Sequence, residues 1–368
     1  MRRRPAGSAA RGATTGEPGP IAVGAARGRW LTLGRDGRLS LYAPARDGLL
    51  RWTETVPGGP GWSGPHHATV AGLTHLSVAQ GTNGYVHFLG RRERPAADGS
   101  PQVDIVHAIQ YQTGLAVTDW RSLGNPHPDR TEAARLGPPS GAVAADGTVH
   151  AFVRGARGGL LLRREDAKGK WRAWEDLGGA GADAHPAAVA LSGGRIEVCA
   201  AAETGTLVWR QSDPGGDVSG PRGFALRPSP GTVSALETAP DRAVFLWTDA
   251  ETGEAHAWRL GGSPVGLGGA GADQPYAAVR TSLDGSDWTV LATRDATGSA
   301  VLGMGVTEQE ADGFWWHGLA ASCQGAPALA LDGRGRVTVA LIGADGVPMV
   351  ARQEDGAAGL VLTDWQRL

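Results

Sequence analysis

The sequence has few of the features that would cross-link a chain or carry it into a membrane. Cysteine occurs only as Cys199 and Cys323, too few and too far apart for a disulfide framework or a zinc motif. No apolar run approaches the roughly 20 residues of a membrane-spanning helix, and no apolar signal-peptide core follows Met1. We therefore expect a soluble, cytoplasmic protein without a membrane span and without a bound metal or other cofactor.

An excess of charge of either sign is also absent. The 35 basic and 37 acidic residues leave a formal net charge of −2, whereas proteins that capture phosphate backbones or anionic lipids carry a clear positive excess. We therefore expect no nucleic-acid partner. Lysine occurs only at positions 168 and 170, and this preference for arginine is typical of a GC-rich bacterial genome.

Turn-forming residues and tryptophan are abundant. The chain contains 58 Gly, 23 Pro and 13 Trp, although aromatic residues make up only 6% of it. This composition indicates many short strands joined by tight turns, and little helix. Residues 1–20 are expected to form a flexible tail, because Gly, Pro, Ser, Thr and Arg cannot bury enough apolar surface to fold. Residues 21–368 are expected to form one domain.

An internal repeat is clearest in residues 140–179. Four short strands are predicted there, at 142–145, 148–153, 160–164 and 171–174, and Asp146-Gly147 supplies the positive φ angles of a two-residue hairpin turn. Four antiparallel strands in succession form one sheet, which cannot bury both of its faces alone. Such sheets stack radially against one another.

The opening strand of this unit, made mostly of small apolar residues, occurs seven times. Its copies begin 44 to 66 residues apart, at Ile21, Leu76, Ala142, Ala187, Val233, Ala277 and Ala328. Small residues suit the crowded axis where the sheets converge. The bulkier tryptophans are placed on the outer strands, as Trp52, Trp120, Trp174, Trp316 and Trp365. The sequence therefore predicts an all-β protein, a seven-bladed β-propeller of four-stranded antiparallel blades.

Two details of the repeat remain to be assigned, namely where the first unit begins and what the extra residues of the second unit form. The first unit could also open within residues 29–37, but Ile21 is preferred because the spacing from Ile21 to Trp30 matches that from Leu76 to Tyr85. On that assignment the first and last blades meet without exchanging a strand. Residues 91–100 lengthen the second unit and are expected to form an exposed loop.

The third unit also carries a recognisable pattern. Trp171-x-x-Trp174 is followed by Leu177-Gly178-Gly179 and by the strand Pro-Ala-Ala-Val at 186–189, and partial copies occur at 268–279 and 315–319. This pattern resembles that of the PLL-like lectin propellers, which have seven blades. The resemblance implies binding of fucose or a related sugar in pockets between blades, with aromatic rings stacked on the sugar. The residues it points to are Trp171, Trp174, Trp315 and Trp316.

Polar residues gather in the loops that lead from the outer strand of one unit to the inner strand of the next. In propellers these loops meet at one mouth of the central channel, which is a common place for ligands. They carry His66, His67, His127, Asp129, Asp183, His185, Asp273, Gln274, Tyr276, Cys323 and Gln324.

Four further polar residues interrupt the apolar opening strands, namely His75, Gln80, Glu237 and Arg280. A charge beside a narrow channel needs a partner. Glu237 and Arg280 are therefore expected to pair across the channel or to hold a ligand.

The segment Gly178-Gly-Ala-Gly-Ala-Asp183 is repeated at 268–273. A phosphate-binding loop needs a helix N-terminus behind it, and none is predicted here. Both copies are therefore interpreted as turns.

Two functional hypotheses remain open. The first is a ligand-binding propeller without catalytic activity, whose ligand is a carbohydrate or another small molecule. The alternative is an enzyme of bacterial specialised metabolism with one active site at the channel mouth, for which the candidate catalytic residues are His66, His67, His185, Asp183, Asp273, Tyr276, Glu237 and Arg280. Similar pockets between several blades would favour the first, and one deep axial pocket with converging polar groups would favour the second. The lectin resemblance and the lack of a catalytic motif favour binding.

Overall fold

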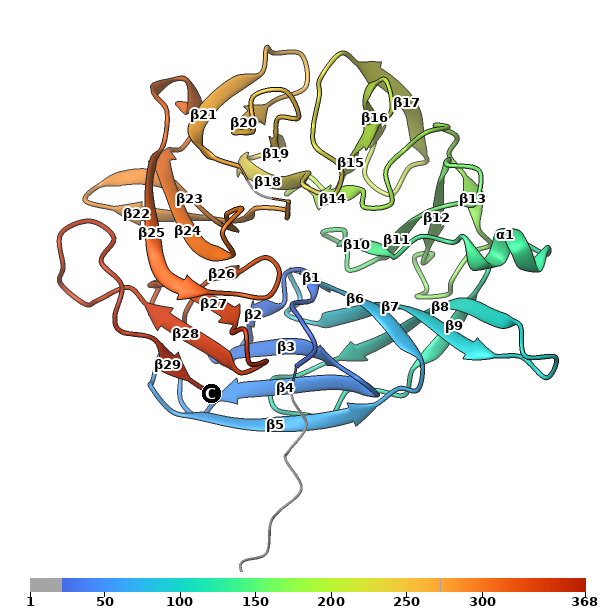
Figure 1. The fold of residues 1–368 in the computed structure, drawn as a ribbon, viewed down its shortest axis with the longest axis horizontal. Helices are drawn as coiled ribbons and strands as arrows, with labels where there is room; N and C mark the ends of the chain where they lie inside the picture. The colour runs from blue at the N-terminus through green and yellow to red at the C-terminus, as the bar shows by residue number, and fades with distance from the viewer. Residues whose placement is uncertain (1–21, 272) are drawn as a thin grey trace, which may run out of the picture.

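The computed structural model describes residues 22–271 and 273–368, which form sheets arranged radially around a central axis (Figure 1). Within these residues there are seven sheets, and each contains four antiparallel strands that follow one another along the chain. The predicted all-β, seven-bladed β-propeller is confirmed. The predicted tail, residues 1–20, lies outside the described residues.

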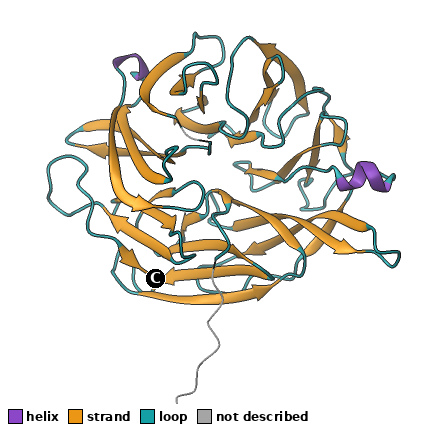
Figure 2. Cartoon of the chain, viewed as in Figure 1, coloured by secondary structure: helices purple, strands orange, loops and turns teal. Residues whose placement is uncertain are grey.

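Helix is scarce, as the composition predicted. In the part of the chain that the structure describes, it is confined to α1 (Arg130–Ala134) and the 3-10 helix η1 (Glu310–Asp312) (Figure 2). Neither of these short helices has the length to cross a membrane.

The first four blades run from the inner to the outer strand in chain order. Blade 1 consists of β2 (Leu31–Leu33), β3 (Leu39–Ala45), β4 (Gly48–Glu54) and β5 (Trp62–Thr69). Blade 2 consists of β6 (Leu73–Gln80), β7 (Val86–Pro95), β8 (Pro101–Gln110) and β9 (Arg121–Gly124). Blade 3 consists of β10 (Ser140–Val143), β11 (Val149–Arg154), β12 (Leu160–Arg164) and β13 (Glu175–Asp176). Blade 4 consists of β14 (Ala187–Ala190), β15 (Ile196–Ala202), β16 (Gly205–Gln211) and β17 (Val218–Phe224).

The last three blades have the same order. Blade 5 consists of β18 (Ser234–Ala239), β19 (Arg242–Thr248), β20 (Glu254–Trp258) and β21 (Val265–Ala270). Blade 6 consists of β22 (Ala277–Leu283), β23 (Ser286–Arg294), β24 (Ser299–Val306) and β25 (Trp315–Ser322). Blade 7 consists of β26 (Ala328–Leu331), β27 (Val337–Ile342), β28 (Pro348–Arg352) and β29 (Gln366–Arg367).

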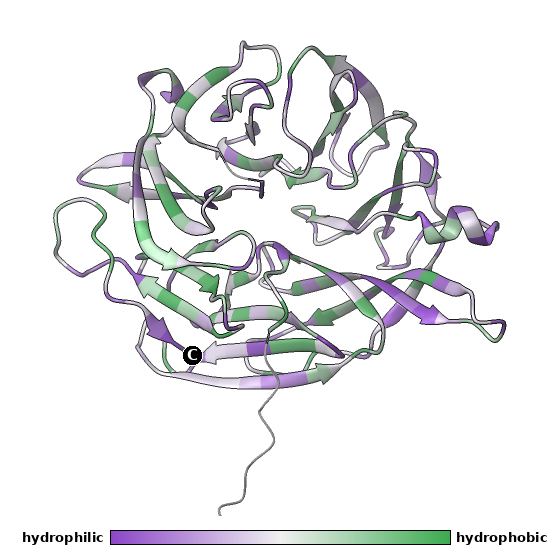
Figure 3. Ribbon diagram, viewed as in Figure 1, coloured by the Kyte–Doolittle hydropathy of each residue, from purple (hydrophilic) through white to green (hydrophobic). Residues whose placement is uncertain are grey.

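The core lies between the blades. The two middle strands of the blades are the most deeply buried, and every residue of β4 and of β27 is buried. Figure 3 shows apolar residues along such strands. This distribution follows from radial stacking, because a middle strand is covered by a neighbouring blade on each face.

The first blade opens later than the preferred assignment. Ile21 lies outside the described residues, Ala22 and Val23 form no strand, and the innermost strand of blade 1 is β2. The segment before it forms β1 (Arg27–Gly28), which pairs in parallel with β6, with Arg27 opposite Ser77 and Gly28 opposite Val78. The preference for Ile21 was therefore wrong, and the alternative within residues 29–37 was correct. Sequence spacing could not show that this segment joins the second blade.

Half of the predicted loop at residues 91–100 is strand, and the remainder, 96–100, forms the turn of a hairpin. Residues 91–95 continue β7, and Pro95 pairs with Pro101 at the start of β8. The segment thus lengthens a hairpin of blade 2, since its residues still find partners in the neighbouring strand.

The ring closes between blades 7 and 1 without an exchanged strand, as predicted. Side chains hold this seam instead. Arg352 of β28 donates to the buried Glu54 of β4 at 2.8 Å. Gln366 of β29 donates to the Pro60 carbonyl at 2.6 Å. The closure of the ring therefore depends on a small number of polar contacts and the apolar packing around them.

Tryptophans join consecutive blades by a repeated contact. In four blades an indole Nε1–H donates to a leucine carbonyl on or next to the outer strand of the preceding blade, at 3.0–3.1 Å, in the pairs Trp174–Leu123, Trp209–Leu177, Trp316–Leu267 and Trp365–Leu319. Trp52 was expected on an outer strand but lies on the third strand, β4.

These tryptophans explain the two glycine-rich copies. A Cβ on Gly179 would lie 2.4 Å from the ring of Trp209, and one on Gly269 would lie 2.7 Å from the ring of Trp316. Both glycines also have a positive φ, 88° and 73°, which glycine adopts without strain. In the described residues the next elements are the strands β14 and β22, so neither copy is followed by a helix.

Replacing Trp209 by phenylalanine is expected to lower the free energy of unfolding by about 1–2 kcal/mol. Trp209 is fully buried, and the substitution removes its hydrogen bond to Leu177 and leaves a small void. Urea unfolding measures the change. Trp315→Phe is the control, because this side chain is 62% exposed and its substitution should stay within about 0.5 kcal/mol. Equal effects of the two variants would contradict the structural role of the contact.

Candidate functional site

A cavity of about 470 Å³ occupies the propeller axis. The inner strands β10, β14, β18, β22 and β26 each lie at the end of their sheet, so one edge of each carries backbone groups that pair with no strand of the described chain. Their side chains are mostly small, which leaves the lumen open. The cavity is therefore lined by hydrogen-bond donors and acceptors as well as by methyl groups.

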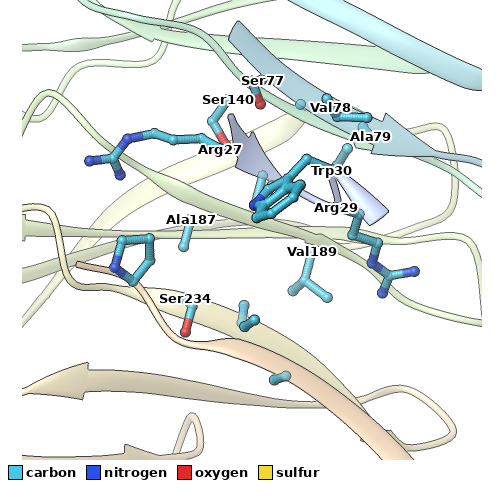
Figure 4. Close-up of a pocket in the computed structure, with 18 of the residues that line it drawn as sticks. Arg27, Arg29, Trp30, Ser77, Val78, Ala79, Ser140, Ala187, Val189 and Ser234 are labelled. Atoms are coloured by element: carbon cyan, nitrogen blue, oxygen red, sulfur yellow. The ribbon is translucent and has the colours of Figure 1, made fainter. Parts of the chain in front are cut away.

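The β1 segment brings two arginines into this cavity. Figure 4 shows Arg27 and Arg29 projecting to opposite sides, with Trp30 between them. Nη1 of Arg27 donates to the Gly231 carbonyl at 3.5 Å. The guanidinium of Arg29 is accessible from the lumen and makes no hydrogen bond or direct ion pair with another described residue.

The protein environment does not fully replace water around these cations. Burial lowers the pKa of Arg27 and of Arg29, while the carboxylates of Asp183 and Glu237, respectively, act in the opposite direction. Both arginines stay charged, because an ordinary arginine pKa lies far above neutral pH.

The two nearby carboxylates already accept hydrogen bonds from the protein. Oε1 of Glu237 accepts from the backbone N–H and the hydroxyl of Ser192 and from the N–H of Asp241, each at 2.8 Å. Asp183 accepts from the N–H groups of Ala184 and Gly231, each at 2.6 Å. These contacts fix the loops around the cavity and direct the carboxylates toward the protein backbone.

His185 lines the same cavity. Burial and then Arg27 lower its pKa to about 4, against the opposite effect of Asp183. The ring is therefore neutral at pH 7 and can donate one hydrogen bond and accept another. His75 on β6 contributes to the same electrostatic environment, and its own pKa is lowered by burial, Arg91 and Arg27.

Only part of the predicted catalytic set meets at the axis. His185, Glu237 and Tyr276 line the cavity, and the charge of Asp183 acts on the lining residues Arg27 and His185. Tyr276 is only 4% exposed, its hydroxyl lies 3.0 Å from that of Thr248, and burial raises its pKa to about 12. Asp273 instead pairs with Arg294 at 3.6 Å.

The predicted positions of His66 and His67 in a rim loop were wrong. Both belong to β5, the outer strand of blade 1, opposite Arg51 and Leu50. His67 contacts Asp47 at 3.0 Å. The strand continues through both histidines to Thr69, so they lie on an exposed outer strand instead of at the channel.

The expected pair of Glu237 and Arg280 was also wrong. Arg280 on β22 contacts Asp287 of the neighbouring strand at 3.5 Å. The arginine whose pKa is affected by the charge of Glu237 is Arg29. Residues on inner strands can face either neighbouring blade, and the sequence did not show which side chains share a face.

The remaining rim residues have structural contacts. Asp129 caps α1 by accepting from the N–H of Glu132 at 2.9 Å, and His127 accepts from the N–H of Ala156 at 3.1 Å. Cys323 is buried, which raises its pKa to about 11. The rim residue Gln324 and the inner-strand residue Gln80 donate to backbone carbonyls at 2.6 and 2.8 Å, while Gln274 lines the cavity.

The four tryptophans predicted to bind sugar differ in exposure. Trp174 and Trp316 contact preceding blades as described above, and Trp171 packs edge-on against His107 at a centroid distance of 5.1 Å. Trp315 is 62% exposed, and its ring centroid lies 5.6 Å from that of Trp288. Of the four, Trp315 is the most exposed, and the other three are half-buried.

The sequence analysis missed Arg27, Arg29 and Trp30. The signal was present, since Arg27-Gly-Arg-Trp30 interrupts a run of small apolar residues. It was not recognised because this segment was assigned to the interior of the first blade. Its pairing with β6 places it on the axis instead.

Comparison with known proteins supports the class that the fold defines. No family model matches the chain, and no curated protein matches it in sequence. The BP39L lectin from Burkholderia pseudomallei is 15% identical, with a TM-score of 0.68 over 92% of this chain and 99% of that one. A PL25 ulvan lyase is 12% identical, with a TM-score of 0.57 over 94% and 96%.

A third solved structure, AofleA from Arthrobotrys oligospora, is 12% identical, with a TM-score of 0.54 over 80% of this chain and 85% of that one. At these identities the likeness shows the fold alone. The chain is a seven-bladed β-propeller with an axial cavity, and its membership of the PLL-like lectins stays a prediction.

Proposed function

We propose that this propeller is a carbohydrate-binding protein without catalytic activity, and that it holds one ligand in the axial cavity. The observation that carries the proposal is the cavity itself, whose volume of about 470 Å³ falls within the usual range for small-molecule sites, about 300–1,000 Å³. Sugars present many hydroxyl groups, and the free edges of the inner strands offer matching backbone donors and acceptors.

Side chains add to this polar lining. The hydroxyl of Ser234 borders the cavity, is buried, and has no hydrogen-bond partner among the described residues. A buried hydroxyl without a partner is costly, and a ligand hydroxyl would satisfy it. Trp30 lies beneath the cavity lining and is only 1% exposed, so it supports the wall of the cavity without offering its ring to a ligand. The described structural neighbours include a lectin and a lyase that acts on ulvan.

A single axial pocket was also the feature expected of an enzyme, but the groups around it do not favour catalysis. Glu237 and Asp183 already accept two or three hydrogen bonds each, and the Tyr276 hydroxyl is engaged. His185, with its pKa lowered to about 4, is a weak base at pH 7, whereas a general base works best with a pKa near the operating pH. The site is better suited to holding a ligand than to moving protons.

Isothermal titration calorimetry with a panel of neutral and acidic mono- and disaccharides, including fucose, tests this proposal. We expect one ligand per chain. Gln274→Trp, which places a larger side chain in the cavity lining, should weaken binding at least tenfold, whereas Trp315→Ala at an exposed residue should leave it unchanged. Several ligands per chain, or loss of binding in Trp315→Ala alone, would place the site elsewhere. Failure of every sugar to bind would overturn the function.

A further inference from the structure

The arginines of the axial cavity need more hydrogen-bond acceptors than the protein provides. Each guanidinium carries five N–H donors. Arg27 uses one of them on the Gly231 carbonyl at 3.5 Å, and Arg29 uses none on any described residue. A partly enclosed cation is costly unless it is paired or fully solvated. Arg29 is exposed to the lumen, where its N–H donors are free to bind a ligand, so the cavity carries a guanidinium that no described residue holds by a hydrogen bond or a direct ion pair.

The nearby carboxylates do not form ion pairs with these two arginines. Glu237 receives three hydrogen bonds from Ser192 and Asp241 on one oxygen, and Asp183 receives one on each oxygen. Neither makes a direct ion pair with Arg27 or Arg29 within the described residues. Turning either carboxylate toward an arginine would leave backbone N–H groups without an acceptor.

Arg29 is held in place by backbone contacts. Its own N–H donates to the Val78 carbonyl at 2.9 Å, and the preceding residues pair with β6. The adjacent Trp30 is 1% exposed. The guanidinium thus projects into the lumen from a fixed backbone (Figure 4), and its planar fork of N–H donors suits the two oxygens of a carboxylate or sulfate.

From these contacts we propose that the axial site selects an anionic sugar, one that carries a carboxylate or a sulfate group, and that Arg29 binds this group. The proposal rests on the proposed carbohydrate-binding function and narrows its ligand class. Arg27 projects the other way and has Asp183 and Gly231 nearby, so it acts at the opposite side of the cavity. Its charge adds to the attraction for an anion without occupying the same position.

Three sugars that differ only at C6 provide the test. Glucose, glucuronic acid and glucose 6-sulfate, and the same three in the galactose series, are titrated by calorimetry into the full chain. In the unmodified protein we expect at least one acidic sugar to bind tenfold or more tightly than its neutral counterpart. The acidic sugar that shows this preference identifies whether the site selects a carboxylate or a sulfate.

Variants locate the charge that is responsible. Arg29→Gln should abolish the preference for the acidic sugar and keep the weak binding of the neutral sugar. Arg29→Lys, which keeps the charge, should retain part of the preference. The matched control is Arg227→Gln, an exposed arginine paired with Glu251 on the outer surface, which should keep the preference. Thermal unfolding of each variant confirms that it is folded.

The outcomes separate this inference from the proposed function. Equal binding of acidic and neutral sugars would overturn the anionic class and leave carbohydrate binding intact. If no sugar binds, inorganic sulfate is the remaining probe. Sulfate that stabilises the unmodified protein but not Arg29→Gln would support the anion site and reject carbohydrate as the ligand, and the absence of that difference would reject both.

Discussion

Replacing Glu54 by alanine is expected to lower the free energy of unfolding by about 3–5 kcal/mol, because removal of one partner leaves the other charge buried and unpaired. Glu54 is completely buried, and its Oε1 accepts from Arg352 at 2.8 Å. Its Oε2 accepts from the N–H groups of Leu39 and Gly58 at 2.8 and 3.2 Å. The variant thus breaks the polar link across the seam and also leaves two backbone donors without acceptors. Equilibrium unfolding in urea gives the change.

Two further variants identify the cause. Glu54→Gln combined with Arg352→Met should recover much of the loss, since the amide oxygen still accepts from the backbone and the unpaired cation is gone. The exposed pair Arg227–Glu251, with both side chains about 70% exposed, serves as the control, and Glu251→Ala should cost less than about 1 kcal/mol. If Glu54→Ala costs no more than this control, the Glu54–Arg352 pair adds no net stability to the seam.

Stability is expected to fall steeply as the pH drops from 7 to 5. Burial lowers the pKa of His87 and His150 to about 4 and that of His107 to about 3, whereas the unfolded chain has an ordinary histidine pKa near 6.5. Below pH 6.5 the unfolded state therefore binds protons that the folded state does not, and stability decreases until the folded pKa is reached. Each histidine contributes a loss of about 2 kcal/mol at pH 5.

Urea midpoints at pH 7, 6 and 5 measure this dependence. His150→Leu should flatten the profile by the contribution of one histidine, because the unfolded variant has one fewer site to protonate. The comparison variant is His66→Ala, which changes an exposed residue of β5 and should leave the slope of the unmodified protein in place. A His150→Leu profile as steep as that of the unmodified protein would show that this histidine is not held neutral by burial.

The blade count could be predicted because a blade is a local structure. In blade 3 the turn between β10 and β11 contains Asp146-Gly147, as predicted, although only Gly147 has a positive φ, 88°, and the connection is longer than two residues. Successive hairpins pair residues that are close in sequence, so each unit has its own pattern of strands and turns. Seven copies of that pattern therefore predicted seven sheets.

The candidate site was predicted less well, because it depends on contacts between distant segments. Arg27 pairs with Ser77 through β1 and β6, and no local pattern indicates a parallel contact between those positions. Arg280 contacts Asp287 on β23, the next strand of its own blade, instead of Glu237. His66 and His67 were misplaced because a continued strand and a rim loop have similar polar composition.

The sequence by itself determined the strands, the tight turns and the small residues of the inner edges, since these follow from backbone preferences and from pairing between neighbours in the chain. Only the tertiary structure shows that the segment before the first blade enters the channel and pairs with the second blade. This pairing places Arg27 and Arg29 in a cavity whose carboxylates already accept backbone hydrogen bonds. The physical reason is that the charges around a cavity come from several blades, and the sequence of one repeat does not show which side chains of the others lie beside it.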